Sequence, residues 1–69
     1  MKYTDERNLL FERFCRMAVA EKGADLSRLL TLFIAENASY TEFISRHAIL
    51  FIKTAEAARK HPECLKTGN

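Results

Sequence analysis

The side chains best suited to chemistry in this chain are two histidines, His47 and His61, and two cysteines, Cys15 and Cys64. The cysteines lie far apart and form no CxxC pair or Cys/His ligand spacing, so they indicate neither a metal site nor a disulfide framework. His47 has no His, Asp or Glu three or four residues away, and a metal ligand or general base needs such partners. We therefore interpret His47 as a packed histidine that bonds a backbone group or faces its mate across a dimer axis.

Sequence motifs of catalysis are absent as well. The chain has no GxSxG or HExxH motif and no pair of carboxylates in an apolar setting, and its two glycines are too few for a phosphate-binding loop. A short helical chain also offers little volume for an active-site pocket. We therefore expect a protein that is not an enzyme and that needs no cofactor or metal.

Length and composition bound the architecture. A chain of 69 residues buries only about 60% of its unfolded surface on folding, which allows one core and one domain. Its 48% hydrophobic and 29% charged residues are typical of a globular protein. We expect a single helical domain over residues 1–61 and a short tail over 62–69, with a solvated basic stretch of Arg59, Lys60, His61 and Lys66.

Charge and cysteine usage indicate the surroundings of the protein. A net charge of +2, spread without a block of like charge, is too weak to indicate nucleic-acid binding by itself. Free thiols suit a reducing compartment. The longest apolar run, Ala48 to Ile52, is too short for a signal peptide or a membrane span. We expect a cytoplasmic protein without membrane contact.

Hydrophobic periodicity predicts an all-α, compact three-helix domain. The first helix spans about 5–22, with Thr4 or Asp5 as its N-cap and Gly23 as its stop. The second spans 26–36 and begins after Asp25. Their apolar faces follow the spacing of a buried helical stripe and comprise Leu10, Phe11, Phe14, Cys15, Met17 and Ala18, then Leu26, Leu29, Leu30, Phe33 and Ile34.

The third predicted helix spans about 40–60. It begins at a capping box, Ser39-Tyr40-Thr41-Glu42, in which the side chains of Ser39 and Glu42 each accept from the other's backbone amide. It ends before Pro62, which disfavours helical geometry in the residue that precedes it. Two neighbouring seams make up its core face: Tyr40, Phe43, His47, Leu50, Thr54 and Ala57, and beside them Ile44, Ala48, Phe51, Ala55 and Ala58.

Four large aliphatic residues lie outside the predicted core faces: Leu9, Leu32, Ile49 and Ile52. Single surface aliphatics are common, but four exceed what we expect of so small a chain, and an apolar patch marks a partner surface. We predict a partner or dimer interface at Leu9, Leu32, His47, Ile49 and Ile52. Two-fold pairing is the commonest assembly, so we expect a homodimer that joins two domains into a larger helical bundle.

A line of cations accompanies this apolar set. Arg46, Lys53 and Lys60 recur every seven residues and therefore lie along one side of the third helix. They are candidates for contacts with an anionic partner. A solvated face, in which Glu42 and Glu56 intersperse the cations, is the alternative interpretation.

Two segments resemble DNA-binding families. Residues 5–37, in the order helix, Glu-Lys-Gly turn and helix, resemble the two-helix part of ribbon-helix-helix repressors, which are dimers that read DNA with an N-terminal strand. Residues 32–47 are similar to a helix-turn-helix segment, with Ala35 in its tight position and Ser39 where glycine is usual. We assign no DNA-contact residue, because only four residues precede the first helix and each predicted helix start already carries a carboxylate.

These observations together predict a small helical protein–protein interaction or regulatory factor. We expect its partners to be a second copy of itself and an unidentified protein. A small DNA-binding transcriptional regulator is the alternative.

Overall fold

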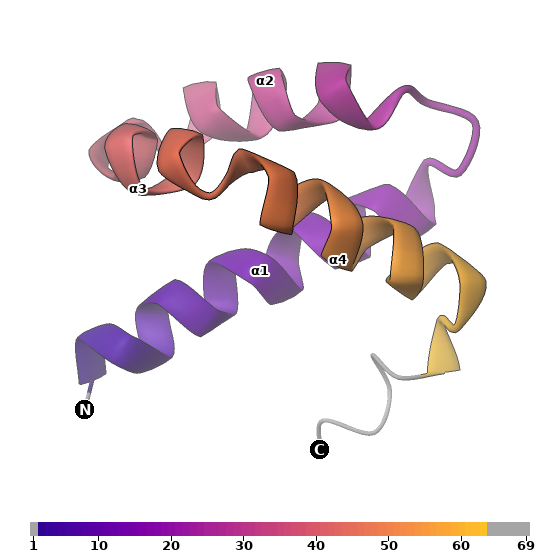
Figure 1. Cartoon of the computed structure of the whole chain (residues 1–69), viewed down its shortest axis with the longest axis horizontal. Coiled ribbons are helices and arrows are strands. Elements are labelled where there is room, and N and C mark those ends of the chain that lie inside the picture. The colour runs from indigo at the N-terminus through magenta and orange to yellow at the C-terminus, as the bar shows by residue number, and fades with distance from the viewer. Residues whose placement is uncertain (1, 64–69) are drawn as a thin grey trace.

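The described part of the chain forms four α-helices that cross around one core (Figure 1). This computed structural model describes the backbone of residues 2–63 and the side chains of residues 6–63. The helices are α1 (Lys2–Ala20), α2 (Leu26–Glu36), α3 (Thr41–Arg46) and α4 (Ala48–Lys60), and a 3₁₀ helix, η1 (Ala38–Tyr40), precedes α3. No strand occurs within residues 2–63, so the all-α prediction is confirmed, but the predicted three helices are four.

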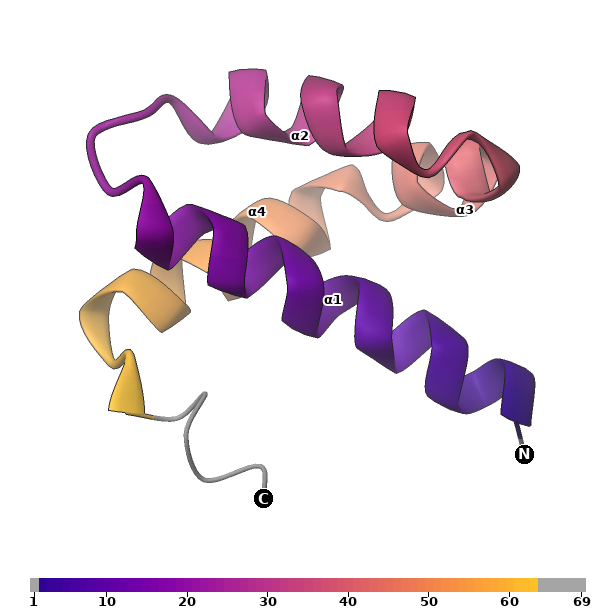
Figure 2. The same ribbon diagram turned by 180° about the vertical axis from the view of Figure 1, so that it is seen from behind.

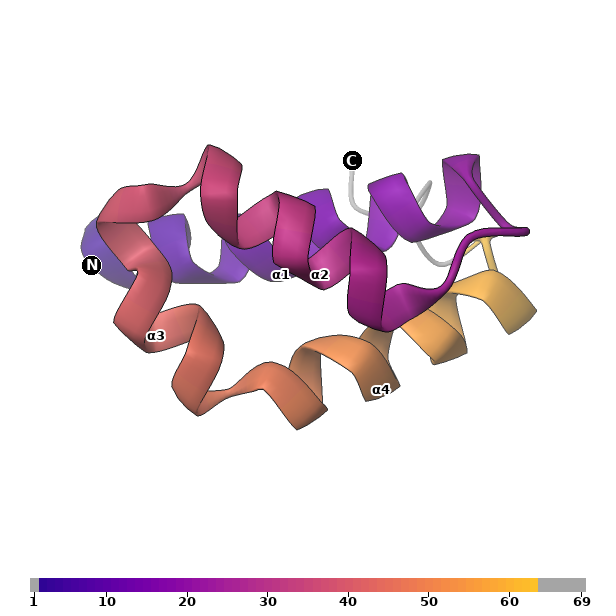
Figure 3. The same cartoon turned by 90° about the horizontal axis from the view of Figure 1, so that it is seen from above.

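The helices are arranged in about two layers. Helices α1 and α4 cross and share the largest interface, and Figure 2 shows α1 in front of α4 from behind. Figure 3 shows α2 lying above both, with α3 at one end of the molecule. The shortest extent, 17 Å, corresponds to two helices packed at roughly 8–10 Å between axes. Each long helix therefore has one side in the core and another toward solvent.

All five phenylalanines of the chain meet in this core. Phe51 of α4 is completely buried and contacts the other four rings. It stacks on Phe11 at 4.0 Å between ring centroids, and it meets Phe14 at 5.9 Å and Phe33 and Phe43 at 6.1 Å each. Offset-stacked and edge-to-face ring pairs contribute about 0.5–1.5 kcal/mol beyond their buried area. This cluster joins all four helices.

Smaller apolar side chains fill the space around the rings. The buried set includes Leu10, Ala18, Leu26, Leu29, Leu30, Ile44 and Ala55. These residues belong to the predicted faces of the first two helices and to the second seam of the third. The core positions predicted there are confirmed.

Helix α2 follows its prediction closely. Its bounds, Leu26–Glu36, coincide with the predicted range, and Asp25 occupies the N-cap position in an extended conformation. The carbonyl of Asp25 accepts the first helical hydrogen bond from the Leu29 amide at 3.0 Å, although its side chain makes no capping bond. At the other end, the Asn37 side chain donates to the Phe33 carbonyl at 2.9 Å and closes the last turn.

Helix α1 differs from its prediction at both ends. It begins at Lys2, so Thr4 and Asp5 lie inside the helix, and their prediction as N-cap is wrong. Nothing in the first residues stops a helix, because they include neither glycine nor proline. It ends at Ala20, and Gly23 has no positive φ, so Gly23 is not the left-handed stop that was predicted.

Arg59 of α4 closes the end of α1 instead. Its guanidinium donates from Nε to the Ala18 carbonyl at 2.9 Å and from Nη2 to the carbonyls of Glu21 and Ala24 at 2.7 and 2.9 Å. The last carbonyls of a helix have no partner within the helix, and Arg59 supplies a donor to one of them, that of Ala18, and to the carbonyls of Glu21 and Ala24 in the turn that follows α1. The prediction that Arg59 is a solvated residue of a basic tail is wrong. Residues 64–69 of that tail, including Cys64 and Lys66, lie outside the described residues, and the boundary at residue 61 stays a prediction.

The predicted third helix is interrupted at His47. Its backbone there has φ −110° and ψ 26°, which ends α3 and begins α4. The His47 amide and the ring Nδ1 both approach the Phe43 carbonyl, at 3.2 and 3.0 Å, and the His47 carbonyl accepts from Phe51 at 2.9 Å. The side chain thus competes for a backbone acceptor, and the continuous helix over 40–60 is wrong.

The start of this segment also differs from the predicted capping box. Ser39 lies in η1, the N-cap of α3 is Tyr40, and no side chain caps α3. Glu42 bonds Arg46 at 3.2 Å, and the nearby hydroxyl of Thr41 donates to the Ala38 carbonyl at 2.8 Å. The capping-box prediction is wrong, because the chain turns through a 3₁₀ helix before α3 begins.

Replacing Arg59 with Ala should lower the free energy of unfolding by about 2 kcal/mol, because three carbonyl groups at the end of α1 lose charged donors. Arg59→Lys should restore part of the lost free energy of unfolding, because one ammonium group cannot reach all three carbonyls as the wider guanidinium does. Urea denaturation measures the effect, and Lys60→Ala, at the exposed neighbouring position, is the matched control. Equal stability of the Arg59 and Lys60 variants would contradict the assigned role.

Replacing Ser39 with Ala should change the free energy of unfolding by less than about 0.5 kcal/mol, because Ser39 is exposed and caps no helix. A capping box would lose about 1 kcal/mol on the same substitution. Chemical denaturation of the variant beside the unaltered protein distinguishes the two values, and the larger loss would restore the capping box.

Candidate interaction surface

Helix α4 has a buried face and an opposite outer face. Phe51, Ala55 and Ala58 are buried in the core. Successive residues are about 100° apart around a helix, so the residues opposite this stripe point away from the molecule. They form the α4 outer face, which comprises Ile49, Leu50, Lys53, Glu56, Ala57 and Lys60, all of them exposed.

Two large aliphatic side chains stand next to each other on the α4 outer face. Ile49 is 71% exposed and Leu50 is 51% exposed. Completely burying such a side chain contributes about 1.5–3 kcal/mol. The fold leaves much of this contribution unused at both residues, so a partner that covers them would gain it.

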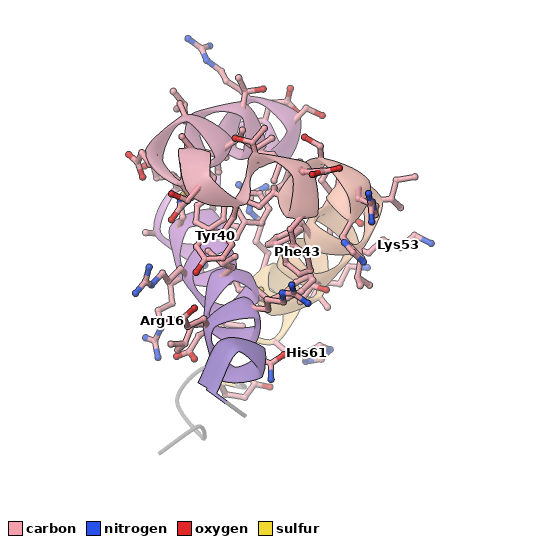
Figure 4. The ribbon with its side chains drawn as sticks, turned by 90° about the vertical axis from the view of Figure 1, so that its left-hand side faces the viewer. Arg16, Tyr40, Phe43, Lys53 and His61 are labelled. Carbon is pink, nitrogen blue, oxygen red and sulfur yellow. The ribbon has the colours of Figure 1, made fainter. Side chains whose placement is uncertain are left out.

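Cations lie on the same surface. Lys53 projects away from α1 and α2 in Figure 4, one helical turn beyond Ile49 and Leu50. Arg46, at the end of α3, pairs with Glu42 at 3.2 Å, but both side chains are largely exposed and such a pair contributes little. Lys53 and Lys60 form no ion pair with any side chain that the structure describes. The three predicted cations are therefore exposed, but the break at His47 places Arg46 on α3, so only Lys53 and Lys60 lie on one helix with the aliphatic pair, and the single line along one helix is wrong.

A shallow hollow adjoins the α4 outer face. Its lining includes Arg46, His47, Ile49, Leu50 and Lys53. A second hollow shares Arg46 and His47 and extends to Arg7, Glu42 and Phe43. The surface beside Ile49 is thus concave, with cationic side chains in its wall.

Arg7 contributes to this region from α1. Its guanidinium carbon lies 5.2 Å from the centre of the Phe43 ring, within the range of a cation–π interaction. Sequence reasoning missed Arg7, because its position beside Phe43 follows from tertiary packing, in which Phe11 of α1 meets Phe43 of α3, and no local pattern encodes this.

His47 supports the surface without projecting from it. The residue is half-buried, and its ring packs on Phe43 at 4.7 Å between centroids. Because a carbonyl oxygen only accepts, the Nδ1–H group donates to the Phe43 carbonyl. The interpretation of His47 as a packed histidine bonded to the backbone is confirmed, and its role in an interface stays a prediction.

Leu9 and Leu32 are exposed elsewhere. Leu9 is 43% exposed and lines a hollow with Arg13 and Tyr40, whereas Leu32 is 51% exposed. Leu9 lies about 160° around α1 from Phe11, whose ring stacks on α4. Leu9 is therefore turned away from α4.

The orientation of Leu32 follows from Ser27, which lines a hollow with residues of α4. Leu32 lies about 140° around α2 from Ser27, on the other flank of the helix. The predicted interface residues do not gather on one surface. Ile49 belongs to the α4 outer face, and Leu9 and Leu32 belong to the sides of α1 and α2.

Two positions on α4 differ from their predictions. Ile52 is partly buried and packs against the core, so its prediction as a residue outside the core is wrong. Leu50, which was predicted in a core seam, is exposed. The reason is that the buried stripe of α4 runs through Phe51, Ala55 and Ala58, which leaves Leu50 outside the core, although Tyr40 and Phe43 of the same predicted seam pack against it.

The remaining reactive side chains are accounted for by the fold. Cys15 is a buried free thiol, and burial, together with the nearby charge of Glu12, raises its pKa. Its reactive thiolate form is therefore disfavoured. Tyr40 donates to the Glu6 carboxylate at 2.9 Å and ties η1 to α1, and this hydrogen bond raises the pKa of Tyr40. In Figure 4 its side chain is turned toward α1.

No three His, Cys, Asp or Glu side chains within the described residues form a group that could hold a metal ion. None of the helices over residues 2–63 is both long and apolar enough to cross a membrane. Comparison of the chain with known protein families, with curated proteins and with solved structures finds no match. The exposed residues of the α4 outer face are therefore the features from which a function can be inferred.

Proposed function

We propose that this protein is a small helical protein–protein interaction factor, without catalytic activity of its own, that binds another protein through the α4 outer face. The supporting observation is the pair of adjacent exposed aliphatics, Ile49 and Leu50, on a helix whose opposite side is buried. Scattered surface aliphatics need no explanation, but neighbouring ones beside a concave surface are typical of a binding site. The cytoplasmic location stays a prediction.

The proposal keeps the homodimer predicted from the sequence but moves its interface away from the third predicted helix, to Leu9 and Leu32 of the five predicted residues. Leu9 and Leu32 supply exposed apolar area on α1 and α2, separate from the α4 outer face. A second copy that covers these leucines would enlarge a core that is small in a chain of this length, and two-fold pairing is the commonest way to do so. The α4 outer face would remain accessible in such a dimer.

The dimer should appear as a species of about twice the 8.0 kDa chain mass at micromolar concentration, because pairing removes exposed apolar area from water. Leu32→Asp should yield a monomer, whereas Leu50→Asp should remain dimeric. These two leucines are equally exposed, at 51%, which makes them a matched pair. Sedimentation equilibrium measures the mass, and a monomer for the unaltered chain would refute the dimer alone.

Binding of a partner protein should depend on the α4 outer face. In affinity capture from the source cells, Leu50→Asp should lose the protein that the unaltered chain retains, because a charge replaces a side chain that the complex buries. Leu32→Asp should keep that protein. Circular dichroism establishes that each variant is folded before the capture is interpreted.

The DNA-binding alternative predicts that different variants lose binding. The cations Arg46, Lys53 and Lys60 favour it, and binding to phosphates would weaken steeply with salt. Joint replacement of these three cations by Gln should then abolish binding, while Leu50→Asp keeps it. That result would replace the proposed function with the alternative.

A further inference from the structure

The charges around Ile49 and Leu50 indicate what kind of protein covers them. On the surface of α4, Ile49, Lys60 and Lys53 lie within about 40° of one another around the helix axis. The aliphatic pair and the two lysines are therefore one surface. A partner that buries Ile49 must also lie beside these cations.

This surface carries more cations than acids. Lys53 and Lys60 have no ion-pair partner among the described side chains, and only Arg46 has one, the exposed Glu42. Glu56, the one acidic residue within α4, is exposed on the same face about 20° around the helix from Ile49, so the three cations exceed the two acids, Glu42 and Glu56, by one. Opposite charge on a partner would speed association and pair these cations, whereas like charge would oppose binding.

We propose that the occupant of the α4 outer face is an amphipathic helix of another protein, with Asp or Glu residues flanking its apolar stripe. This inference rests on the proposed function and specifies the partner's chemistry. The apolar stripe covers Ile49 and Leu50 and enters the hollow beside them, and the acidic residues meet Lys53, Lys60 and Arg46.

The shape of α4 suits a helical partner. Thirteen residues make a surface of roughly 20 Å, enough to lie along about four turns of another helix. Ala57, exposed between the two lysines, has only a methyl group and lets another helix approach closely. Binding of an amphipathic helix through spaced apolar anchors is a common mode of peptide recognition.

A second copy of this chain offers this face its own excess of cations rather than the acids that would pair them. A two-fold axis across α4 near Lys53 sets this lysine against its own copy, and an axis between Ile49 and Leu50 sets Lys53 against Arg46 of the other copy. Like charges placed opposite one another destabilise a contact. The homodimer proposed above uses Leu9 and Leu32 and does not compete for this surface.

A titration with two synthetic peptides tests the proposal. Both are amphipathic helices with leucines at the same positions, and they differ only in flanking residues, which are Glu in one and Lys in the other. The full ¹⁵N-labelled chain is titrated with each, and amide shifts report the site. We expect the Glu peptide to shift residues 46–60 and to bind roughly tenfold more tightly than the Lys peptide at low salt, a preference that salt should reduce.

Matched variants locate the effect. Leu50→Asp should lose the Glu peptide, Leu32→Asp should keep it, and Lys53→Gln should weaken it several-fold without changing the spectrum elsewhere. The proposal is overturned if neither peptide binds, if both bind equally, or if the shifts map to α1 and α2. It is also overturned if anionic phospholipid vesicles or a DNA duplex shift residues 46–60 more strongly than the Glu peptide does.

These outcomes are separate from those of the capture experiment. A cellular protein that is lost with Leu50→Asp, together with no preference for the Glu peptide, leaves the proposed function standing and refutes the acidic helix. If Leu50→Asp retains the captured protein and the Glu peptide is not preferred, both the proposed function and the acidic helix are refuted.

Discussion

The contact of Phe51 with the other four phenylalanine rings is the constraint on which the structure depends. The rings come from α1, α2, α3 and α4, so each helix must bring a side chain to one point. Close packing allows little displacement there, because interiors are filled to the density of organic crystals. The crossing of α1 and α4 and the position of α2 above them follow from this requirement. The orientation of α4 about its own axis is set at the same time.

Hydrogen bonds of polar side chains add to the contacts of the five rings. Arg59 donates to three carbonyls at the end of α1 and so attaches the C-terminal half of α4 to the turn that follows α1. Tyr40 performs a similar task at the other end of the molecule through Glu6. His47 satisfies the Phe43 carbonyl where the chain bends. Arg59 and Tyr40 thus connect elements distant in sequence, whereas His47 acts locally at the end of α3, as a capping residue does.

This difference explains how far the sequence alone allowed prediction. Helix α2 and the buried stripe through Phe51 follow from local periodicity, and both were predicted. The early end of α1 and the role of Arg59 depend on contacts between residues distant in sequence, whereas the break at His47 involves a local bond from its ring to the Phe43 carbonyl, with no glycine or proline to mark it. In the candidate site, the exposure of Ile49 was predicted, but Leu50 and Ile52 were exchanged. Which of two adjacent seams enters the core is decided by the packing of Phe51, and periodicity does not distinguish them.

The same packing separates the folding role of α4 from its proposed binding role. Phe51, Ala55 and Ala58 supply contacts to the core, and the residues on the opposite side supply none that the fold requires. In a molecule two helices thick, an outer face is unavoidable, and a polar one would satisfy the fold equally well. The fold therefore accounts for the presence of this face but not for Ile49 and Leu50 on it. Under the proposed function, a partner that covers Ile49 and Leu50 removes their apolar area from water, and acidic residues on that partner pair with the lysines beside them.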